Sequence, residues 1–354
     1  MKELLKQSLG IDCAMDEHVA SFSVMTGEFE IVHRATLTFK NTKSGFEKLN
    51  KWIQHQHPIQ SLVIVMEATG VYHEQLACFL TDRNYYVSVI LPNKAKYFAK
   101  TLDLKTVNDK IASQSLAIMG LEKKLSKWEK PSELLNKIRQ LTRERDQIVN
   151  ERTQIKCQLH AEKSGAWANA SSIKRMNQRI KILDKQEAEI KNEIAELVKK
   201  DAELARKIKL VSTIKGVGLL TAATVIAETN GFRTVRNKKQ LVSYAGLDVM
   251  QHTSGISINK KSKISKHGNK YLRKCLHLPA LSAIKSSKNQ KELFVRLVSR
   301  HGIKMKAAVA VQRKLLVLIY TIWKTETPYD TNYEVKKSRN ELGQPRRATL
   351  KELA

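Results

Sequence analysis

Acidic residues are scarce in this chain. Its 354 residues include 34 Asp and Glu against 63 Lys and Arg, which gives a formal net charge of +29. An enzyme of small metabolites has no need of such an excess, whereas a polyanionic partner is attracted by it. The basic residues recur along the whole chain and do not flank an apolar anchor. We therefore expect a nucleic acid as the partner, and not a membrane.

Cysteines and long apolar runs are also few. The four cysteines lie far apart without a Cys-x-x-Cys pair, which argues against a zinc ribbon and a disulfide framework. The apolar run at residues 315–323 is too short to span a bilayer, and the first ten residues contain no signal-peptide core. We expect a cytoplasmic, nucleoid-associated bacterial protein without membrane attachment.

Strands alternate with helices over residues 1–125, which we expect to form the first domain. Apolar runs separated by turn residues predict a three-strand meander between residues 8 and 39. The pattern further predicts helices at 43–56, 72–83, 93–102 and 107–121 and strands at 61–66 and 85–91. This is the pattern of an α/β sheet covered on both faces, in which ligands gather at the strand ends.

Three acids in this domain are candidates for a metal site. Asp12 and Glu67 each end an apolar strand without a neighbouring Lys or Arg, and Asp109 lies on a later helix. Carboxylates that converge without cations repel one another unless they share a hard divalent cation. Mg²⁺ accepts such oxygens and can promote chemistry at a phosphodiester. A solvated or helix-capping role is the alternative for each acid taken singly.

Residues 126–208 are rich in Glu, Lys, Arg, Gln and Leu. Apolar residues recur at steps of three and four on either side of Gly165, which predicts two long helices joined by a turn in an antiparallel coiled coil. Polar residues at seam positions, such as Arg145 and Arg152, interrupt the pattern. We expect this arm to serve self-association, and the alternative is a spacer within one chain.

Residues 209–330 are expected to form a mainly helical third domain. Residues 208–228 resemble the hairpin of a helix-hairpin-helix, in which Gly216 and Gly218 would free backbone amides to meet a phosphate. A plain glycine-containing turn between helices is the alternative. An apolar core helix is predicted at 307–323, and the tail at 331–354 is predicted to be disordered.

The stretch from Tyr244 to Arg273 is strongly basic. The pair Ser254 and Gly255 precedes a run of cations with almost no acid nearby, namely Lys260, Lys261, Lys263, Lys266, Lys270 and Arg273. A hydroxyl beside so much positive charge suits chemistry on a phosphate. The cations suit backbone phosphates, which position a nucleic acid without specifying its sequence. A solvated basic loop, in which Ser254 only shapes a turn, is the alternative.

Three segments carry a resemblance to a known family. GIDCAMDEH, VIVMEATGVYHEQLACFL and KTVNDKIASQSLAIMGLE resemble the acidic motifs of the RuvC-like, RNase H-like domain of the DEDD insertion-sequence transposases, family one-ten, related to the Piv invertases. The resemblance places Mg²⁺-binding acids at Asp12, Glu67 and Asp109. The fourth acid is missing, because Ala112 stands three residues after Asp109. Either three acids suffice, or another such as Asp103 substitutes, or Ala112 is an inactivating replacement of an aspartate.

The C-terminal segments GVGLLTAATVIAE, KQLVSYAGL, SGISINKKSKISKHGNKYLRKCL and KMKAAVAVQRKLLVLIY resemble the transposase domain of the same family. Its nucleophile is the serine of the Ser-Gly pair, which falls on Ser254. The resemblance implies a transposase that exchanges DNA strands through a phosphoseryl intermediate. It also implies a structured bridge RNA that pairs with donor and target DNA, and dimers that assemble into a tetramer.

Two other classes of function stay open. A nuclease of the Holliday-junction resolvase type would use the acids alone with water as the nucleophile, and Ser254 would be dispensable. A catalytically inactive nucleic-acid-binding relative is the other, and Ala112 is the feature that favours it.

Overall fold

The computed structural model describes residues 4–56, 62–103, 106, 108–233, 235–255 and 258–332. The chain divides into two compact units, Met1–Lys130 and Pro131–Ala354, and each is described by itself. The first ends five residues beyond the predicted boundary at 125. The second contains both the predicted arm and the predicted third domain, because the arm shares a core with the helices that follow it.

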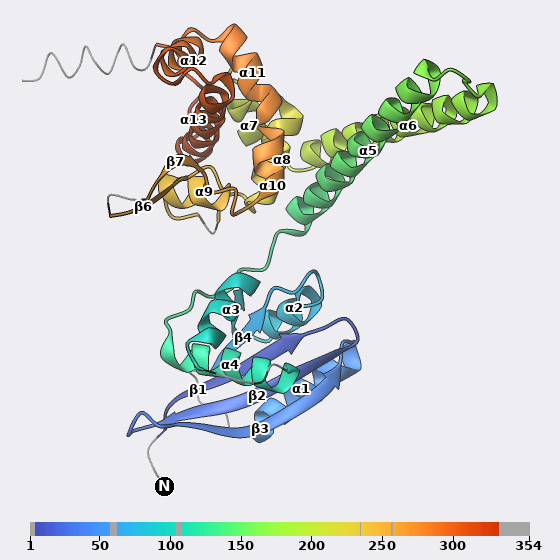
Figure 1. Cartoon of the computed structure of the whole chain (residues 1–354). Coiled ribbons are helices and arrows are strands. Elements are labelled where there is room, and N and C mark those ends of the chain that lie inside the picture. The colour runs from blue at the N-terminus through green and yellow to red at the C-terminus, as the bar shows by residue number, and fades with distance from the viewer. Residues whose placement is uncertain are drawn as a thin grey trace, which may run out of the picture. The chain divides into compact units, whose positions relative to one another are not determined.

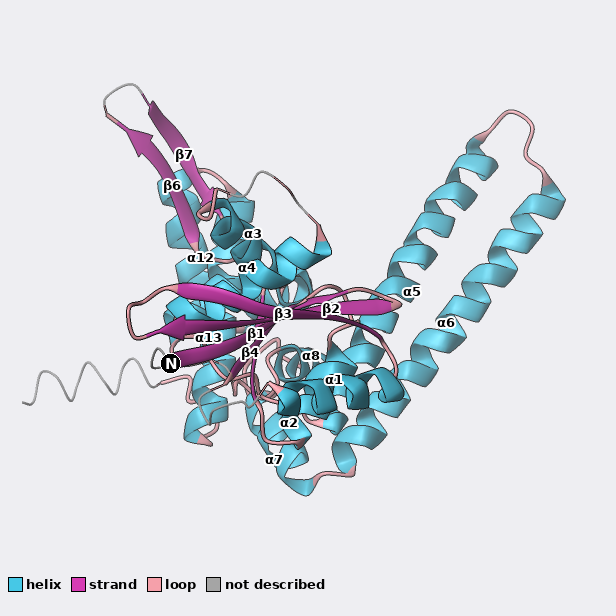
Figure 2. Ribbon diagram, turned by 90° about the horizontal axis from the view of Figure 1, so that it is seen from below, coloured by secondary structure: helices cyan, strands magenta, loops and turns pink. Residues whose placement is uncertain are grey.

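A five-stranded mixed sheet forms the centre of the first unit (Figures 1 and 2). The strands β1 (Leu4–Cys13), β2 (Glu17–Thr26) and β3 (Ile31–Lys40) form an antiparallel meander. β4 (Val63–Glu67) lies parallel to β1, and β5 (Tyr86–Ile90) lies parallel to β4, so that the order is β3-β2-β1-β4-β5. This mixed sheet is the one expected of a RuvC-like domain, and the prediction of the fold of this unit is confirmed.

Helices cover both faces of the sheet. On one face α1 (Lys43–His55) and α2 (Glu74–Asp82) bury a core that includes Phe22, Phe46 and Leu76. On the other face α3 (Pro92–Lys100) and α4 (Asp109–Glu122) pack on Val65. The central strands β1 and β4 are therefore covered on both faces, as their apolar sequences predict, whereas the edge strand β3 is largely exposed.

A glycine lets α4 approach the central strand closely. A Cβ atom at Gly10 of β1 would lie 2.0 Å from the backbone oxygen of Ser113 and 2.3 Å from the backbone nitrogen of Ala117. The Ser113 hydroxyl in turn lies 2.7 Å from the Ser21 hydroxyl of β2, in the buried interior. These contacts fix both the height and the rotation of α4 above the sheet.

The second unit is mainly helical, which confirms that part of the prediction. The helices α5 (Glu133–Ser164) and α6 (Ala170–Lys199) run antiparallel as a long arm (Figure 1). The body contains α7 (Ala202–Val211), α8 (Leu219–Glu228), α9 (Lys238–Tyr244), α10 (Lys270–Cys275), α11 (His277–Ser286), α12 (Lys288–His301) and α13 (Lys304–Thr325). Coiled-coil packing of the arm stays a prediction.

The polar residues at the arm's seam have a partner in the structure. Arg145 and Arg152 both bind Glu187 of α6, at 2.7 and 2.5 Å. Burial raises the pKa of Glu187, but hydrogen bonds from Lys191, Arg145 and Arg152 outweigh it and lower the pKa to about 2. The seam is thus held partly by a buried charge cluster, which an apolar-periodicity argument does not detect.

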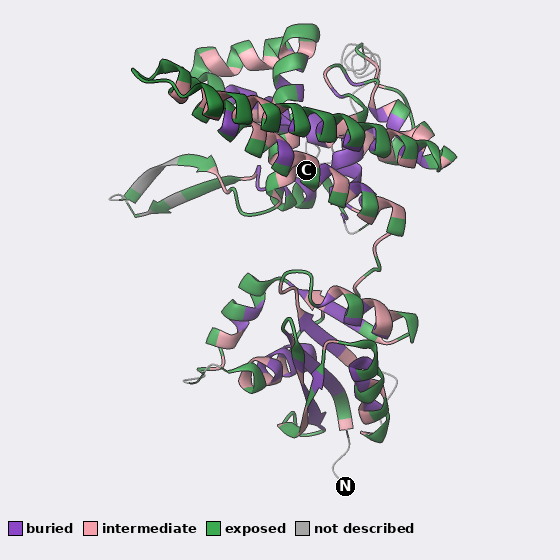
Figure 3. Cartoon of the chain, turned by 90° about the vertical axis from the view of Figure 1, so that its right-hand side faces the viewer, coloured by how far each residue is buried: buried purple, intermediate pink, exposed green. Residues whose placement is uncertain are grey.

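A β-hairpin that the sequence did not predict projects from the second unit. β6 (Val249–Ser254) pairs antiparallel with β7 (Ile258–Ile264), and Figure 3 shows its described residues as largely exposed. Val249, Met250 and Ile258 are all exposed. Because most of the described side chains of the hairpin are exposed, its sequence lacks the alternation that marks a half-buried strand, and it resembles a basic loop.

No helix among the described residues is long and apolar enough to cross a membrane. The predicted core helix at 307–323 is confirmed as α13, whose buried face includes Leu315 and Ile319. Of the tail, residues 333–354 lie outside the described residues, so its predicted disorder stays a prediction.

Candidate active site

Two of the candidate acids lie side by side on the sheet. Gly10 pairs with Val65 in the parallel ladder between β1 and β4, and both contact α4. Alternate residues of a strand share a face, so Asp12 and Glu67, each two residues further on, also lie on the face that α4 covers. Both are half-buried. The carboxyl ends of two parallel strands thus bring these carboxylates together.

The third acid begins the helix that covers this face. Asp109 is the first residue of α4, where Asn108 caps the helix by accepting a hydrogen bond from the Ile111 amide at 2.8 Å. The helix N-terminus carries partial positive charge and favours a carboxylate. Asp109 is exposed and close enough to Asp12 for its charge to act on that carboxyl group. The structure therefore brings all three predicted acids to one edge of the sheet.

The acids repel one another in the absence of a cation. Burial, and next the charge of Asp109, raise the pKa of Asp12. Burial, and next the charge of Asp12, raise the pKa of Glu67. None of the three has an ion-pair partner among the described residues. This oxygen donor set, with its uncompensated charge, fits a hard divalent cation.

The acids do not form a closed ligand shell. Within the described part of the chain, no three His, Cys, Asp or Glu side chains are gathered tightly enough to hold a metal ion. Ala112 lies one turn after Asp109 and is half-buried, and its amide donates to the Asn108 oxygen. Residues three apart on a helix share a face, so an acid at 112 would join Asp109 beside the sheet. Asp103 precedes the helix in an exposed turn.

The candidate nucleophile lies in the other unit. Ser254 is the last residue of β6, and its Cα pairs with that of Ile258 across the hairpin. Gly255 follows with a φ of 54°, and no atom lies within 4 Å of where its Cβ would be. The side chains of Ser254, Lys260 and Lys261 lie outside the described part of the structure. The backbone of Ser254 is therefore carried near the end of a projecting hairpin.

The root of this hairpin is held by backbone hydrogen bonds. The Lys266 amide donates to Gly246 at 3.1 Å, and the Asn269 amide donates to Tyr244 at 2.8 Å. Gly268 is required here, because a Cβ on it would lie 2.4 Å from the Tyr244 oxygen at a φ of 144°. The two ends of the basic stretch thus meet, and the hairpin emerges from a defined base.

The predicted phosphate-binding cations differ in their surroundings. Lys263, Lys266 and Lys270 are exposed and available to a ligand. Arg273 is half-buried, and its Nη1 donates to the Ala245 oxygen at 2.9 Å and the Asn269 oxygen at 3.3 Å. The Arg273 guanidinium therefore braces the hairpin root, a role that its place in a basic run did not indicate.

The two glycines of the helix-hairpin-helix pattern also differ. Gly216 has a φ of 90°, and a Cβ there would lie 2.6 Å from the Pro279 oxygen. It lets the turn pack on α11. Gly218 caps α8 and has no atom within 4 Å of its Cβ position. Of the two, Gly218 has the space that a phosphate contact needs, and the helix-hairpin-helix itself stays a prediction.

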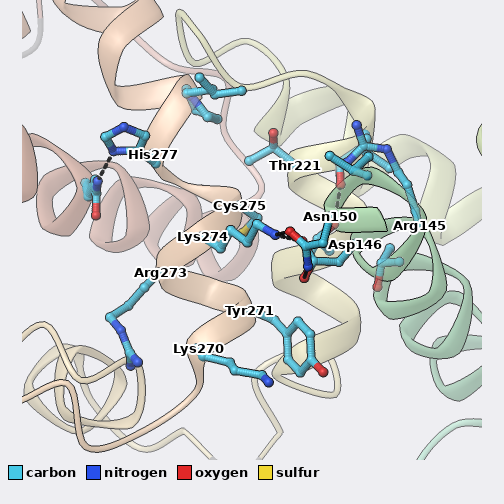
Figure 4. Close-up of a pocket in the computed structure, with 17 residues that line it drawn as sticks. Arg145, Asp146, Asn150, Thr221, Lys270, Tyr271, Arg273, Lys274, Cys275 and His277 are labelled. Atoms are coloured by element: carbon cyan, nitrogen blue, oxygen red, sulfur yellow. Dashed lines mark hydrogen bonds and ion pairs between the residues drawn. The ribbon is translucent and has the colours of Figure 1, made fainter. Parts of the chain in front are cut away.

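A cleft of about 800 Å³ is lined by residues of α5, α8, α10 and α11. Figure 4 shows Lys274 reaching across it towards Asp146 and Asn150 of α5. The Lys274 ammonium lies 2.5 Å from the Asp146 carboxylate and 2.6 Å from the Asn150 amide oxygen. Its charge is therefore satisfied within the protein, and the cleft is bridged at this point.

Sequence comparison identifies relatives over both units. The family profile of the IS110-type DEDD transposases, described as "Transposase", matches residues 9–162. The profile "Transposase IS116/IS110/IS902 family" matches residues 208–295. The first match includes Asp12, Glu67 and Asp109, and the second includes Ser254.

Individual proteins are similar over most or part of the chain. The pilin gene-inverting protein of Moraxella bovis is 31% identical over 333 residues, which cover 92% of this chain and 98% of that protein. The transposase for insertion sequence element IS1111A of Coxiella burnetii is 34% identical over 125 residues, 34% of this chain and 33% of that protein. Thermus thermophilus RuvC is similar in structure, with 12% identity, a TM-score of 0.25, and coverage of 32% of this chain and 90% of that one.

A near full-length relative that inverts a gene, and two transposase profiles in the expected order, place the chain among the enzymes that transpose and recombine DNA. Within that class it belongs to the IS110 family of DEDD transposases, related to the pilin gene-inverting proteins.

Proposed function

We propose that the chain exchanges strands between donor and target DNA through a covalent intermediate on Ser254. The serine oxygen would form a bond to the scissile phosphorus, while the bond from phosphorus to one deoxyribose oxygen breaks and that oxygen takes up a proton. A hydroxyl of the second DNA would later displace the serine oxygen in the same way. Each step breaks one phosphodiester bond and forms another, so the exchange needs no external energy source.

The observation that carries this proposal is the placement of Ser254 near the end of an exposed hairpin whose root is held by backbone hydrogen bonds. A residue carried near the end of such a hairpin can enter a site that another unit completes. The exposed Lys263, Lys266 and Lys270 at the base of the same hairpin would bind flanking backbone phosphates. Lys260 and Lys261, on β7, are assigned the same role.

Asp12, Glu67 and Asp109 would hold Mg²⁺. Their mutual repulsion and lack of cationic partners are what a hard divalent cation relieves. When bound, it would stabilise negative charge on the phosphate oxygens. The acids themselves would bind and orient the cation beside the scissile phosphate.

The specificity would come from a structured bridge RNA. None of the segments of the sequence resembles a helix-turn-helix or zinc finger that reads bases, whereas the charge of +29 suits the backbones of RNA and DNA. The assembly would be a tetramer of two dimers, in which the acids of one protomer complete the serine site of another.

The decisive experiment compares Ser254→Ala with Thr253→Ala, each tested as the chain stands and with Ala112→Asp. We expect Ser254→Ala to abolish strand exchange and the covalent protein–DNA adduct while DNA binding persists, because no charge is lost. Thr253→Ala, which removes the neighbouring hydroxyl, should retain both. Recombination by Ser254→Ala at the rate of its parent protein would favour the resolvase alternative. If neither the chain as it stands nor its Ala112→Asp variant recombines DNA, the chain would instead be a catalytically inactive relative.

A further inference from the structure

The two ends of the helical arm differ in charge. We define the arm tip as residues 156–181, the end of α5, the turn and the start of α6. It contains six basic residues and one acid, Glu162, for a net charge of +5; the basic residues are Lys156, Lys163, Lys174, Arg175, Arg179 and Lys181. The arm base, residues 133–155 and 182–199, holds eight basic and nine acidic residues, for a net charge of −1. The positive charge of the arm is therefore concentrated at its tip.

The cations of the tip are not used by the fold. All six are exposed. Arg179 lies 3.7 Å from Glu151, and the other five have no ion-pair partner among the residues that the structure describes. At the arm base, by contrast, Arg143 and Arg145 bind the buried carboxylates of Glu228 and Glu187. The tip cations remain available to an anionic ligand.

A tryptophan lies among these cations. Trp167, in the turn between α5 and α6, is 94% exposed, whereas Trp52, Trp128 and Trp323 are half-buried. It borders a shallow hollow of about 440 Å³ whose other lining residues are Gln158, Ala161, Glu162, Gly165 and Met176. The Trp167 ring contributes little packing to the fold, so its apolar faces are open to a partner.

We propose that the arm tip binds an unpaired segment of nucleic acid, with Trp167 stacked on a base and the surrounding Lys and Arg side chains on the adjoining phosphates. An aromatic face within a basic surface is the combination with which proteins hold single strands. A duplex keeps its bases inside its stack, where Trp167 does not reach them. A second copy of the tip is disfavoured as occupant, because two surfaces of +5 repel. The proposal rests on the nucleic-acid partner of the proposed function.

The test uses the full chain with three probes of equal length, an unpaired RNA, an unpaired DNA and a blunt DNA duplex, and follows tryptophan fluorescence. We expect the unpaired probes to quench the emission of Trp167, and Trp167→Phe to lose this quenching while keeping most of the affinity. Trp167→Ala should weaken binding of an unpaired probe about tenfold, since stacking on one base contributes a factor of this order. Stronger quenching by the unpaired RNA would identify RNA as the strand that the arm tip binds, and stronger quenching by the unpaired DNA would identify DNA.

The phosphate contacts are tested by a matched pair of double variants. Lys174→Ala/Arg175→Ala removes two charges from the tip, and Lys185→Ala/Lys199→Ala removes two from the arm base. In the first, the slope of log affinity against log salt concentration should flatten by about 1.4, since each single-strand phosphate contact contributes about 0.7. In the second, the slope should not change.

Two results would overturn the proposal. In the first, unpaired probes quench the fluorescence of Trp167→Phe as strongly as that of the unmodified protein, and Trp167→Ala binds them with unchanged affinity. The other is a change in the mass of the assembly in Trp167→Ala without any change in probe binding, which would make the tip a protein contact. Neither readout requires catalysis, and both should be unaffected by Ser254→Ala. Failure of the tip proposal is therefore distinguishable from failure of the serine mechanism.

Discussion

The Glu228 carboxylate of α8 accepts two hydrogen bonds from the Arg143 guanidinium of α5, at 2.7 Å from Nε and 2.9 Å from Nη2. Its side chain is 1% exposed. Asn269 Nδ2 donates a third hydrogen bond at 2.7 Å, and the Asn269 amide binds the Tyr244 oxygen at the hairpin root. One buried carboxylate thus joins the arm, the body and the root of the hairpin that carries Ser254.

Glu228→Gln should destabilise the protein by about 3 kcal/mol. Removing one partner of a buried pair leaves the other without compensation, and Arg143, 39% exposed, recovers part of its hydration. Denaturant unfolding measures the loss. Glu133→Gln on α5, the helix of Arg143, is the control, because its pair with Lys137 is exposed and should contribute far less. Equal losses in the two variants would contradict the anchoring role of Glu228.

Asp12→Asn should raise the unfolding temperature in metal-free buffer at pH 7 and abolish recombination. The pKa of Asp12 is raised in the folded state by burial and by Asp109. The folded state therefore binds this proton more tightly than the unfolded state does, and stability falls as pH rises through the folded pKa. The penalty is fully present above the folded pKa and disappears below the pKa of the unfolded chain. The stabilising effect of the substitution should therefore shrink in acid.

Mg²⁺ provides the complementary measurement. It should stabilise the parent protein more than Asp12→Asn, because it relieves the repulsion that the substitution has already removed. Asp16→Asn, a change in the exposed turn that follows β1, should leave the Mg²⁺ effect intact. A loss of stability in Asp12→Asn at pH 7 with a chelator present would mean that Asp12 has a cationic partner, and the metal assignment would then be wrong.

Ala112→Asp should create or sharply increase recombination and tighten Mg²⁺ binding. Position 112 is half-buried one turn beyond Asp109 on α4, on the side that approaches Asp12. Ala112→Asn supplies a similar volume without the charge and should have neither effect. Calorimetric titration with Mg²⁺ and a recombination assay measure the two outcomes. Unchanged activity with unchanged metal affinity would support a natural three-acid site.

The sheet and its acids were predictable because their sequence signals are local. β1 and β4 are buried on both faces, so Asp12 and Glu67 stand out as the acids that end apolar runs. Asp109 was a candidate from its place on a later helix, and the family resemblance assigned it to the last acidic motif. Its proximity to Asp12 depends on Gly10, which lets the backbone of α4 contact the backbone of β1. No local sequence pattern reveals that contact.

The second unit was less predictable because its key contacts join distant residues. Arg143 and Asn269 both bind Glu228, from 85 and 41 positions away in the sequence. The sequence around Glu228 shows only an acid at the end of an apolar run. Most of the described side chains of the β6–β7 hairpin are exposed, so its sequence carries little apolar alternation. Arg273 resembled its basic neighbours, and only the fold shows that its guanidinium binds backbone oxygens at the hairpin root.

The protein alone should bind DNA tightly and without sequence preference. A charge of +29 acts through release of counterions from the phosphate backbone, so affinity should fall steeply as salt rises. Sequence preference should appear only with the cognate RNA, because base pairing can select a site while the protein holds the backbone. The measurement is recombination on a library of target sites, with RNAs that differ only in their pairing bases. The selected site should move with those bases and without any change in the protein, whereas selection of one site by the RNA-free protein at physiological salt would refute guidance by RNA.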